Sequence, residues 1–525
     1  MLLRQKRLFS SLLFILALSV ALVACGGGNN NNTADTGNNA QPPTGGGATT
    51  TEPSGTDEPD IYDLDVTDEA QQLITDVLAN RTPTTITYAS WNIAQPQEIP
   101  MIEEYMERFD FITVEVVHIE EDDHMGSLQA LAMAQQLPDA FLVSVVPEMM
   151  ATGFLQDILP YGQQFEEWAN IPRIALEAAT YRGRVFGLPF SSYFEGMVVN
   201  DALWDANNLP RLEVGFSLEQ LLNDLRVITD IGAGIGGISP WIQYSRGWLP
   251  NYFNNAFGPH GWDGERLNVN HPAYAQSIEF IRTLRAEGLV TDSDWLTEEQ
   301  WASYDAGWWY DVFARGNMPV MNEGSWWIGT WTHLYNEGMP VRFVGLPGGT
   351  VVYRPVYAGI SVQSQNPAVA MHFLNWMAFG DAGIEHRLDL RDFGRGEVDD
   401  DGNPILYPLG TLPPTTNSTL LRRFFDGEIP GIEEGLARVH ESVIEGETIV
   451  PGHVPGLFNG NTGLTVVSNG ETIENASVHT VFNSIIEGNT AFADVAADLD
   501  AFANSQVQQM LSEINFMLDM MGLTE

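Results

Sequence analysis

Hydrophobic and polar positions along the first part of the chain follow two alternating periods. Short apolar or alternating runs over residues 84–88, 112–119 and 140–146 are typical of strands, and apolar residues every three or four positions between them predict helices. This strand–helix order favours an α/β fold with a parallel sheet covered by helices. Ligands bind beyond the carboxyl ends of such strands. We therefore expect four residues that follow these strands at the mouth of a cleft: Trp91, Asn92, Ser144 and Glu148.

A polar segment separates two further apolar runs within residues 183–200. Gly187 and Pro189 interrupt the first run, because glycine is permissive and proline fixes its own φ. Tyr193 and Glu195 then supply a phenol and a carboxylate before the second apolar run begins. This pattern suits a strand that crosses between two lobes above a ligand cleft.

Helix-start signals dominate the part of the chain that follows Asn200. They predict helices that begin after Ser217, at Pro272 and after Thr297, the last of which is expected to end near Gly316. An apolar strand then leads into Glu323, a Gly-Ser break and Trp326.

Two more crossings are expected, one over residues 353–360, which include Tyr357, and one over 410–413. Three crossings divide the chain into two lobes, each built from two separate segments. Lobe 1 is predicted to comprise residues 61–193 and 358–412, and lobe 2 residues 194–357 and 413–525.

The N-terminus has the pattern of a secretory signal. Basic residues precede an apolar run over 12–24, which is short for a membrane span, and Cys25 follows it. This junction resembles a bacterial lipobox, which implies lipidation of Cys25 and a signal peptide over residues 1–25. An ordinary secretory signal is the alternative. Residues 26–60 are rich in Gly, Asn, Thr and Pro, and they are predicted to be a disordered tether.

Composition excludes several classes of function. A net charge of -46 over 525 residues leaves no basic stripe for nucleic acid. With Cys25 as the only cysteine, neither a disulfide within the chain nor a CxxC site can form. No HExxH, GxSxG or P-loop motif occurs, so no cofactor and no catalytic metal are expected. Residues Asp399–Asp401 could hold calcium, but a hairpin turn is favoured because their spacing differs from an EF-hand loop.

The position of each aromatic residue indicates whether it lies in the core or in the cleft. Trp326 follows a Gly-Ser break at a strand end, which favours a place in the cleft. For Trp91 the sequence favours neither the cleft nor the core. Trp308, Trp309 and Tyr310 are expected in the core, because they fall within the helix predicted after Thr297. A sugar site needs flat rings against the C–H faces of the sugar and polar groups for its hydroxyls.

Several short motifs, in this order, resemble the extracellular solute-binding proteins of ABC importers, in particular the sugar-binding, maltose-binding-protein-like type. They are Leu137-Pro138-Asp139, the crossing around Gly187-Leu188-Pro189, the segment from Asn322 to Trp327, Asn366-Pro367 before a helix, and the proline-bearing loop 452–459. The resemblance covers residues 84 to the C-terminus and the lipobox. Tyr193 departs from the family pattern, in which this crossing position is another hydrogen-bonding side chain.

The resemblance implies a two-lobe, class II periplasmic-binding-protein fold with three crossovers and an interlobe ligand cleft. It also implies a non-enzymatic, monomeric lipoprotein on the cell surface, which closes on a carbohydrate and delivers it to ABC permease subunits. A peptide or polyamine ligand and a lipid-anchored glycoside hydrolase remain the alternatives. The expected ligand-binding residues are Trp91, Asn92, Ser144, Glu148, Tyr193, Glu195, Glu323, Trp326 and Tyr357.

Overall fold

The computed structural model describes residues 75 to 523 with internal gaps. The residues outside the description are 1–74, 121–122, 399–401, 408, 410, 427–429, 445–453, 457–459 and 524–525. Several predictions therefore lie outside the described residues: the signal peptide with Cys25, the tether, the Asp399–Asp401 turn, Gly410 and most of the loop 452–459. Within the described part, no helix combines the length and the apolar character needed to cross a membrane.

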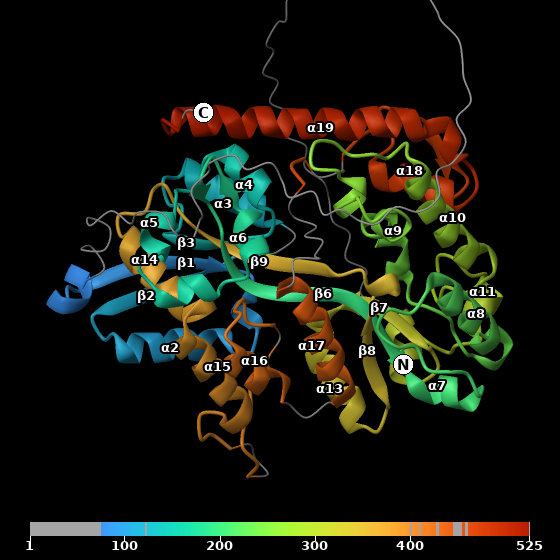
Figure 1. The fold of residues 1–525 in the computed structure, drawn as a ribbon, viewed down its shortest axis with the longest axis horizontal. Helices are drawn as coiled ribbons and strands as arrows, with labels where there is room; N and C mark the ends of the chain where they lie inside the picture. Colours follow the sequence, from blue (N-terminus) through green and yellow to red (C-terminus); the bar gives the residue numbers. More distant parts are fainter. Residues whose placement is uncertain are drawn as a thin grey trace, which may run out of the picture. The chain divides into compact units, whose positions relative to one another are not determined.

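Seven strands form one mixed sheet at the centre of the fold, in the order β2-β1-β3-β9-β6-β7, with β8 also paired to β6 (Figure 1). β1 is parallel to β2 and β3, which confirms the parallel arrangement predicted for the first three strands. The strands β9, β6, β7 and β8 add antiparallel pairs to it. The bounds are β1 Thr84–Ser90, β2 Ile112–His118, β3 Ala140–Val143, β6 Leu188–Asn200, β7 Val320–Gly324, β8 Val341–Gly345 and β9 Val352–Ile360.

Lobe 1 is built around β1, β2 and β3. Its buried core includes Tyr88 of β1, Tyr105 and Phe373. Both tyrosine rings pack edge to face on Phe373, with centroid distances of 5.1 Å for Tyr88 and 5.2 Å for Tyr105. Two short antiparallel strands, β4 Thr180–Tyr181 and β5 Arg184–Val185, precede β6. The helices of this part are α2 Glu98–Arg108, α3 His124–Met133, α4 Val146–Thr152, α5 Leu159–Gly162, α6 Arg173–Glu177, α14 Pro367–Leu374 and α15 Asp381–Phe393, with the 3-10 turns η1 Asn92–Ala94 and η3 Glu166–Asn170 and the π-helix η9 Asn375–Phe379. Helix α16 Ser418–Phe425, which follows the third crossing, packs against α15.

The strand expected over residues 140–146 is shorter than predicted. β3 ends at Val143, and helix α4 starts at Val146 with Pro147 in its first turn. Proline suits the first turn of a helix because the N–H that it lacks would have no partner there. The polar residue Ser144 consequently lies in the connection between strand and helix, and Glu148 lies in the first turn of α4.

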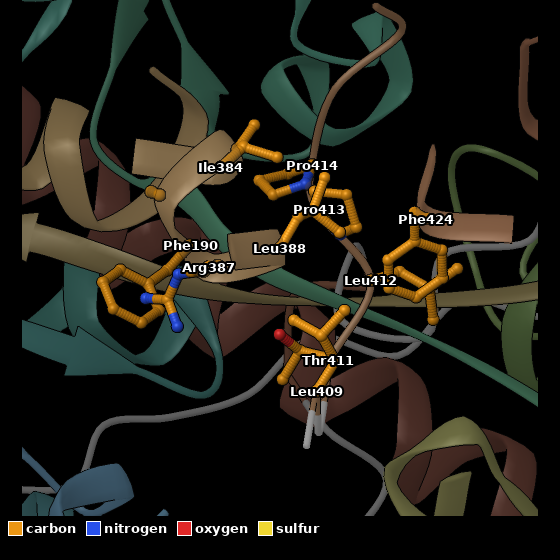
Figure 2. Close-up of a pocket in the computed structure, with 11 residues that line it drawn as sticks. Phe190, Ile384, Arg387, Leu388, Leu409, Thr411, Leu412, Pro413, Pro414 and Phe424 are labelled. Atoms are coloured by element: carbon orange, nitrogen blue, oxygen red, sulfur yellow. The ribbon is translucent and has the colours of Figure 1, made fainter. Parts of the chain in front are cut away.

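β6 and β9 are the first two crossing strands. Residues Leu188 to Glu195 of β6 pair with β9, and Glu195 to Asn200 pair with β7 and β8, so one strand serves both lobes. The third crossing pairs Leu412 with Ser192 through two backbone hydrogen bonds, of 3.1 and 3.0 Å. Figure 2 shows this segment beside α15 and α16, around a small cavity of about 10 Å³ whose wall includes Phe190 and Leu412.

Lobe 2 has two buried clusters, one around Trp204, Leu225 and Ile281 and one around Tyr274 and Phe482. Its helices are α7 Asp201–Ala206, α8 Leu218–Ile228, α9 Leu249–Phe253, α10 Pro272–Ala286, α11 Glu298–Ala302, α12 Trp309–Ala314, α13 Ile328–Asn336, α17 Pro430–Ile444 and α18 Val478–Ile486. The remaining elements are η4 Ile231–Ala233, η5 Pro240–Gly247, η6 Pro259–Gly261, η7 Ser325–Trp327, η8 Pro347–Gly349, and the hairpin β10 Val466–Ser468 with β11 Glu471–Ile473.

The helix predicted from Thr297 to Gly316 is two helices. Thr297 caps α11 with the expected capping box, but α11 ends at Ala302. Asp305 has φ +48°, a left-handed backbone, and α12 begins only at Trp309. This break removes Trp308 from any helix interior.

The last helix, α19 Phe492–Met520, contacts both lobes. Its N-terminal half contributes Leu499 and Val507 to the core with Tyr274. Its C-terminal half packs near α4 (Figure 1), and Met517 lies so close to Gly153 that a Cβ there would be 2.1 Å from the Met517 methyl.

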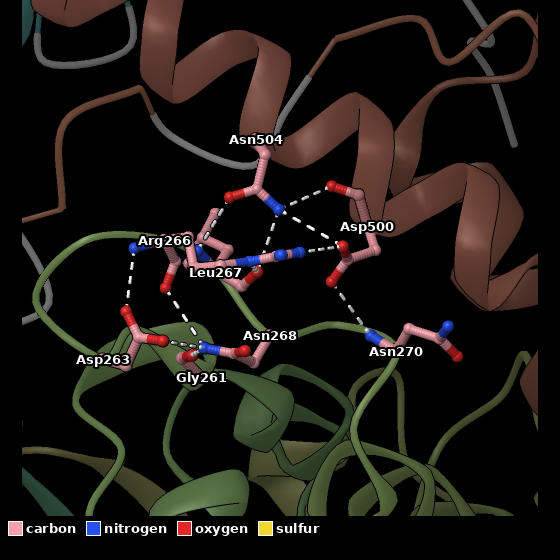
Figure 3. A network of polar contacts seen from close by, with 8 residues as sticks. All are labelled: Gly261, Asp263, Arg266, Leu267, Asn268, Asn270, Asp500 and Asn504. Atoms are coloured by element: carbon pink, nitrogen blue, oxygen red, sulfur yellow. Dashed lines mark hydrogen bonds and ion pairs between the residues drawn. The ribbon is translucent and has the colours of Figure 1, made fainter. Parts of the chain in front are cut away.

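Polar contacts fix α19 at both of its ends. In lobe 2, the Asn504 amide pairs with both backbone groups of Leu267 at 2.9 and 3.0 Å, and Asp500 accepts from Asn270 N–H at 3.2 Å and pairs with Arg266 (Figure 3). In lobe 1, Arg182 donates to Asp519 at 2.6 Å and to Asn515 at 3.0 Å. α19 therefore connects the two lobes directly, in addition to the three crossings.

Candidate ligand-binding site

A cavity of about 490 Å³ lies where the crossing strands enter lobe 2. We call it the aromatic pocket. It takes side chains from β6, β7, η5, η6, η7, β9 and the residue before α12. Its lining residues include Glu195, Trp241, Tyr244, Arg246, His260, Trp308, Asn322, Glu323, Trp326, Trp327 and Arg354.

Trp326 reaches the aromatic pocket because of the glycine that precedes it. β7 ends at Gly324, and the turn η7 then folds the Trp326 indole back over that glycine. A Cβ at residue 324 would lie 2.0 Å from the Trp326 ring, so only glycine allows this close approach. Tyr193 packs edge to face on the indole with 5.9 Å between ring centroids, and 37% of Trp326 is exposed.

Two further groups of rings complete the aromatic wall. On η5, Trp241 and Tyr244 lie 4.9 Å apart between centroids and are 44% and 40% exposed. Trp308 is 49% exposed and lies 6.3 Å from Trp327. The expectation that Trp308 packs in the core is wrong, because the helix break before it turns the ring toward the pocket; Trp309 is buried as expected.

Glu195 and Glu323 bring two carboxyl groups to the pocket from adjacent strands. Arg354 of β9 donates to Glu195 at 3.1 Å, and its guanidinium carbon lies 5.7 Å from the Trp326 ring centroid. Burial raises the pKa of Glu195. Burial also raises the pKa of Glu323 to about 8, with a further contribution from the Glu195 charge. Glu323 therefore carries its proton at neutral pH.

Two polar atoms in the pocket wall lack partners. Asn322 Oδ1 and Glu323 Oε1 are buried and make no hydrogen bond with the described residues. The amide oxygen of Asn322 is an acceptor, whereas the protonated carboxyl of Glu323 can donate or accept. Buried polar atoms without partners are costly, so both atoms favour a ligand with hydroxyl groups, which do both.

Three of the predicted residues gather in lobe 1 around His124, in a group that we call the His124 cluster. The Trp91 ring lies 5.4 Å from the His124 ring, and Ser144 Oγ is 3.0 Å from His124 Nε2. Burial raises the pKa of Glu148, and the charge of His124 opposes that shift. None of these residues lines the aromatic pocket.

Asn92 and Tyr357 lie elsewhere. Asn92 borders a separate cavity of about 30 Å³ with Ser191 and Arg387. Tyr357 is only 3% exposed, and its hydroxyl donates to the Ala175 carbonyl at 2.9 Å. Its ring belongs to the core between β9 and α6 and does not line the aromatic pocket.

Sequence reasoning missed several residues of the pocket wall: Trp241, Tyr244, Arg246, His260, Trp308, Asn322, Trp327 and Arg354. One signal for the η5 group was available, since Pro240 starts a stretch with three aromatic residues and an arginine but no helical period. No group of described residues has the composition of a metal site.

The sheet order, the crossing strands and the pocket beside them define a two-lobe α/β binding protein. The family described as bacterial extracellular solute-binding protein matches residues 100–385, more than half of the 525-residue chain. The chain belongs to this family, which places it outside the cytoplasm. No curated protein matches the chain.

Solved structures of low sequence identity share the fold. An ABC substrate-binding protein of Listeria monocytogenes in complex with cycloalternan is 16% identical, with 84% of this chain and 100% of that chain covered and a TM-score of 0.56. The sugar-binding protein MalE of Xanthomonas citri is 11% identical, covering 82% and 98%, with a TM-score of 0.59. The lacto-N-biose complex of a Bifidobacterium longum binding protein is 15% identical, covering 81% and 97%, with a TM-score of 0.55.

Proposed function

We propose that this protein captures an oligosaccharide in the aromatic pocket and delivers it to ABC permease subunits. The observation that carries the proposal is the distribution of tryptophan. Of the 14 tryptophans in the chain, the exposed ones are Trp241, Trp308 and Trp326, and all three line this pocket. Large exposed rings gathered in one cavity are typical of a ligand site rather than of a solvent-facing surface.

The polar groups of the pocket suit a sugar. Flat rings can cover the C–H faces of pyranose units. Asn322 Oδ1 can accept from a sugar hydroxyl group, and the Glu323 carboxyl can exchange a hydrogen bond with another. The similar structures named above include complexes with cycloalternan and with lacto-N-biose, which supports a saccharide here.

Capture is proposed to involve both lobes. The aromatic pocket supplies the lobe 2 side, and the His124 cluster follows the carboxyl ends of β1 and β3 in lobe 1, where such folds bind ligands. Closure about the crossing strands would bring the two sides together, as in the hinge motion known for periplasmic binding proteins. The closed, monomeric form would then dock the permease, with lipid on Cys25 holding the protein at the membrane.

Two alternatives differ in chemistry. A polyamine is disfavoured because Arg246 and Arg354 lie in the pocket wall. A glycoside hydrolase is favoured by one observation, the protonated Glu323 beside the carboxylate of Glu195, since glycosidases use an acid and a second carboxyl group. Against it, Glu195 is engaged by Arg354 at 3.1 Å. We propose that the protein binds without turnover.

Calorimetric titration of wild type and Trp326→Ala against a panel of oligosaccharides tests the proposal. The variant should lose about tenfold to a hundredfold in affinity, or roughly 1–3 kcal/mol, because a good aromatic anchor contributes on this order. Because Trp326 is 37% exposed, the melting temperature of the variant should fall less than for a tryptophan buried in the core. Phe393→Ala, an exposed ring outside the pocket, is the control. Unchanged sugar affinity in Trp326→Ala would reject this pocket as the site.

A further inference from the structure

Arg246 stands out in the wall of the aromatic pocket because it has no acidic partner. The chain has 69 acidic and only 23 basic residues, so carboxylates are plentiful. Yet Arg246 forms no ion pair within the described part of the chain. Among the described residues it donates to the Gln243 carbonyl, at 3.0 Å. A guanidinium has five N–H donors, so most of the donors of Arg246 are left for a ligand.

Two aromatic rings flank this guanidinium, which is half-buried. Its central carbon lies 5.3 Å from the Tyr244 ring centroid and 4.9 Å from the Phe482 centroid. Burial lowers the pKa of Arg246. A partly buried charge is stabilised when an opposite charge pairs with it, so this position favours an anionic group on the ligand.

The pocket carries a positive balance in a strongly negative protein. Arg246 and Arg354 contribute two positive charges, and Glu195 contributes one negative charge. Glu323 is protonated at pH 7 because burial raises its pKa to about 8, and His260 is neutral because burial lowers its pKa to about 4. One positive charge is left over, although the whole chain carries -46.

We propose that the ligand of this pocket is an acidic carbohydrate, whose carboxylate or sulfate group pairs with Arg246. This inference rests on the proposed function and narrows it, because neutral oligosaccharides would leave the guanidinium without a counter-charge. A guanidinium binds carboxylates and other oxyanions through paired N–H···O bonds, which gives the recognition geometry as well as strength.

Calorimetric titration with charged sugars and their uncharged counterparts tests the inference. One arm uses trisaccharides of galacturonate, glucuronate and mannuronate against their methyl esters, which keep the ring and lose the charge. The other arm uses sulfated disaccharides against the same sugars without sulfate. In one of the two arms the charged sugar should bind about tenfold tighter, or more, than its uncharged counterpart. The arm that shows this preference tells whether the ligand group is a carboxylate or a sulfate. This preference should shrink as salt is raised.

Substitution at Arg246 should remove the preference while leaving the uncharged sugar bound. Arg246→Met keeps an apolar stem and should bring the acid and its ester to within about twofold of each other, since only the acid loses a partner. Arg246→Lys keeps the charge and should retain part of the preference. The control is Arg285→Met, because Arg285 also lies over a ring, Trp295 at 5.1 Å, but does not line the pocket.

The outcomes separate the inference from the proposed function. If neutral sugars bind at least as tightly as their charged counterparts, the acidic ligand is rejected and the sugar-binding pocket stands. If an acid preference persists unchanged in both Arg246 variants, Arg246 is not the anion partner and the inference fails. If no sugar of either kind binds, both proposals fail. Melting curves show whether Arg246→Met is folded, and Arg246→Lys decides the question if it is not.

Discussion

Glu323→Gln gives the sharpest test of the electrostatics of the aromatic pocket. Glu323 lies on β7, opposite Gly196 of β6, and is only 4% exposed. Burial is the main cause that raises its pKa from 4.5 to about 8, and the charge of Glu195 adds to the shift. The nearby indoles of Trp326 and Trp327 act in the opposite direction.

The direction of the pH effect follows from proton binding. In the unfolded chain Glu323 ionises near 4.5, while in the folded protein it keeps its proton until about pH 8. Between these pH values the folded protein keeps the Glu323 proton and the unfolded chain has lost it. Because rising pH favours the state with fewer bound protons, the free energy of unfolding falls as pH rises. Below pH 4.5 this contribution vanishes, and above pH 8 it is constant.

The size of the effect follows from the same shift. A difference of about 3.5 pKa units, from 4.5 to about 8, corresponds to roughly 5 kcal/mol at the alkaline end. Glu323→Gln removes this loss, because an amide of the same shape cannot ionise. The variant should match wild type near pH 4.5 and become more stable by about 2–5 kcal/mol near pH 8.5.

Urea unfolding at pH 4.5, 6.0, 7.5 and 8.5, roughly spanning the titration, measures this difference. Glu471→Gln, on the exposed strand β11, controls for the loss of a charge from an acidic protein. Arg246, Arg354 and His260 also line the pocket and are present in both proteins, so their titration largely cancels in the difference. Glu195 is coupled to Glu323, so its response to the Glu323 charge is part of the measured effect. A stability difference that does not change with pH would refute the buried, protonated Glu323.

Four further outcomes are expected. Cys25→Ala should release the protein from the membrane fraction of its host, and a normally matured variant still in that fraction would contradict the lipid anchor. Purified wild type should return its best-binding oligosaccharide intact in chromatography, whereas accumulating shorter sugars would indicate a hydrolase. Gly324→Ala should weaken sugar binding in calorimetry, since its Cβ would lie 2.0 Å from the Trp326 ring, and unchanged affinity would contradict this contact. Asn504→Ala should cost about 1–3 kcal/mol in urea unfolding, because it leaves the Leu267 N–H without its acceptor and the Leu267 carbonyl with only the 3.4 Å contact from Arg266, and exposed Ser505→Ala is the control.

Local signals in the sequence predicted the parts of the fold that depend on local chemistry. The capping residue Thr297, the crossing strand through Tyr193 and the Gly-Ser break before Trp326 all lie as expected, because each reflects a backbone requirement of a few residues. The break at Asp305 was missed, since a left-handed residue that is not glycine has no strong sequence signature.

The chemistry of the pocket could not be predicted in the same way. Trp308 and Trp309 are adjacent in sequence, yet one is 49% exposed and the other is buried. Likewise, nothing local distinguishes Arg246 from Arg226, which pairs with Glu287 at 2.6 Å. Burial and pairing of a side chain depend on segments far away in the sequence, so exposure of a ring or isolation of a charge becomes visible only in the assembled fold.

The C-terminal helix adds a constraint on closure that no motif suggested. α19 is held in lobe 2 by Asn504 and in lobe 1 by Arg182, so one rigid element spans both lobes. A hinge made only of β6, β9 and the segment at Leu412 could rotate freely, whereas closure here must also move α19 against one lobe. The lobe 1 end is packed as firmly as the lobe 2 end, because Ile514 and Leu518 are buried in one cluster with Met149 of α4, and Arg182 adds polar contacts to them. Closure of the lobes therefore has to disturb either the buried contacts of α19 with α4 or its contacts with Leu267.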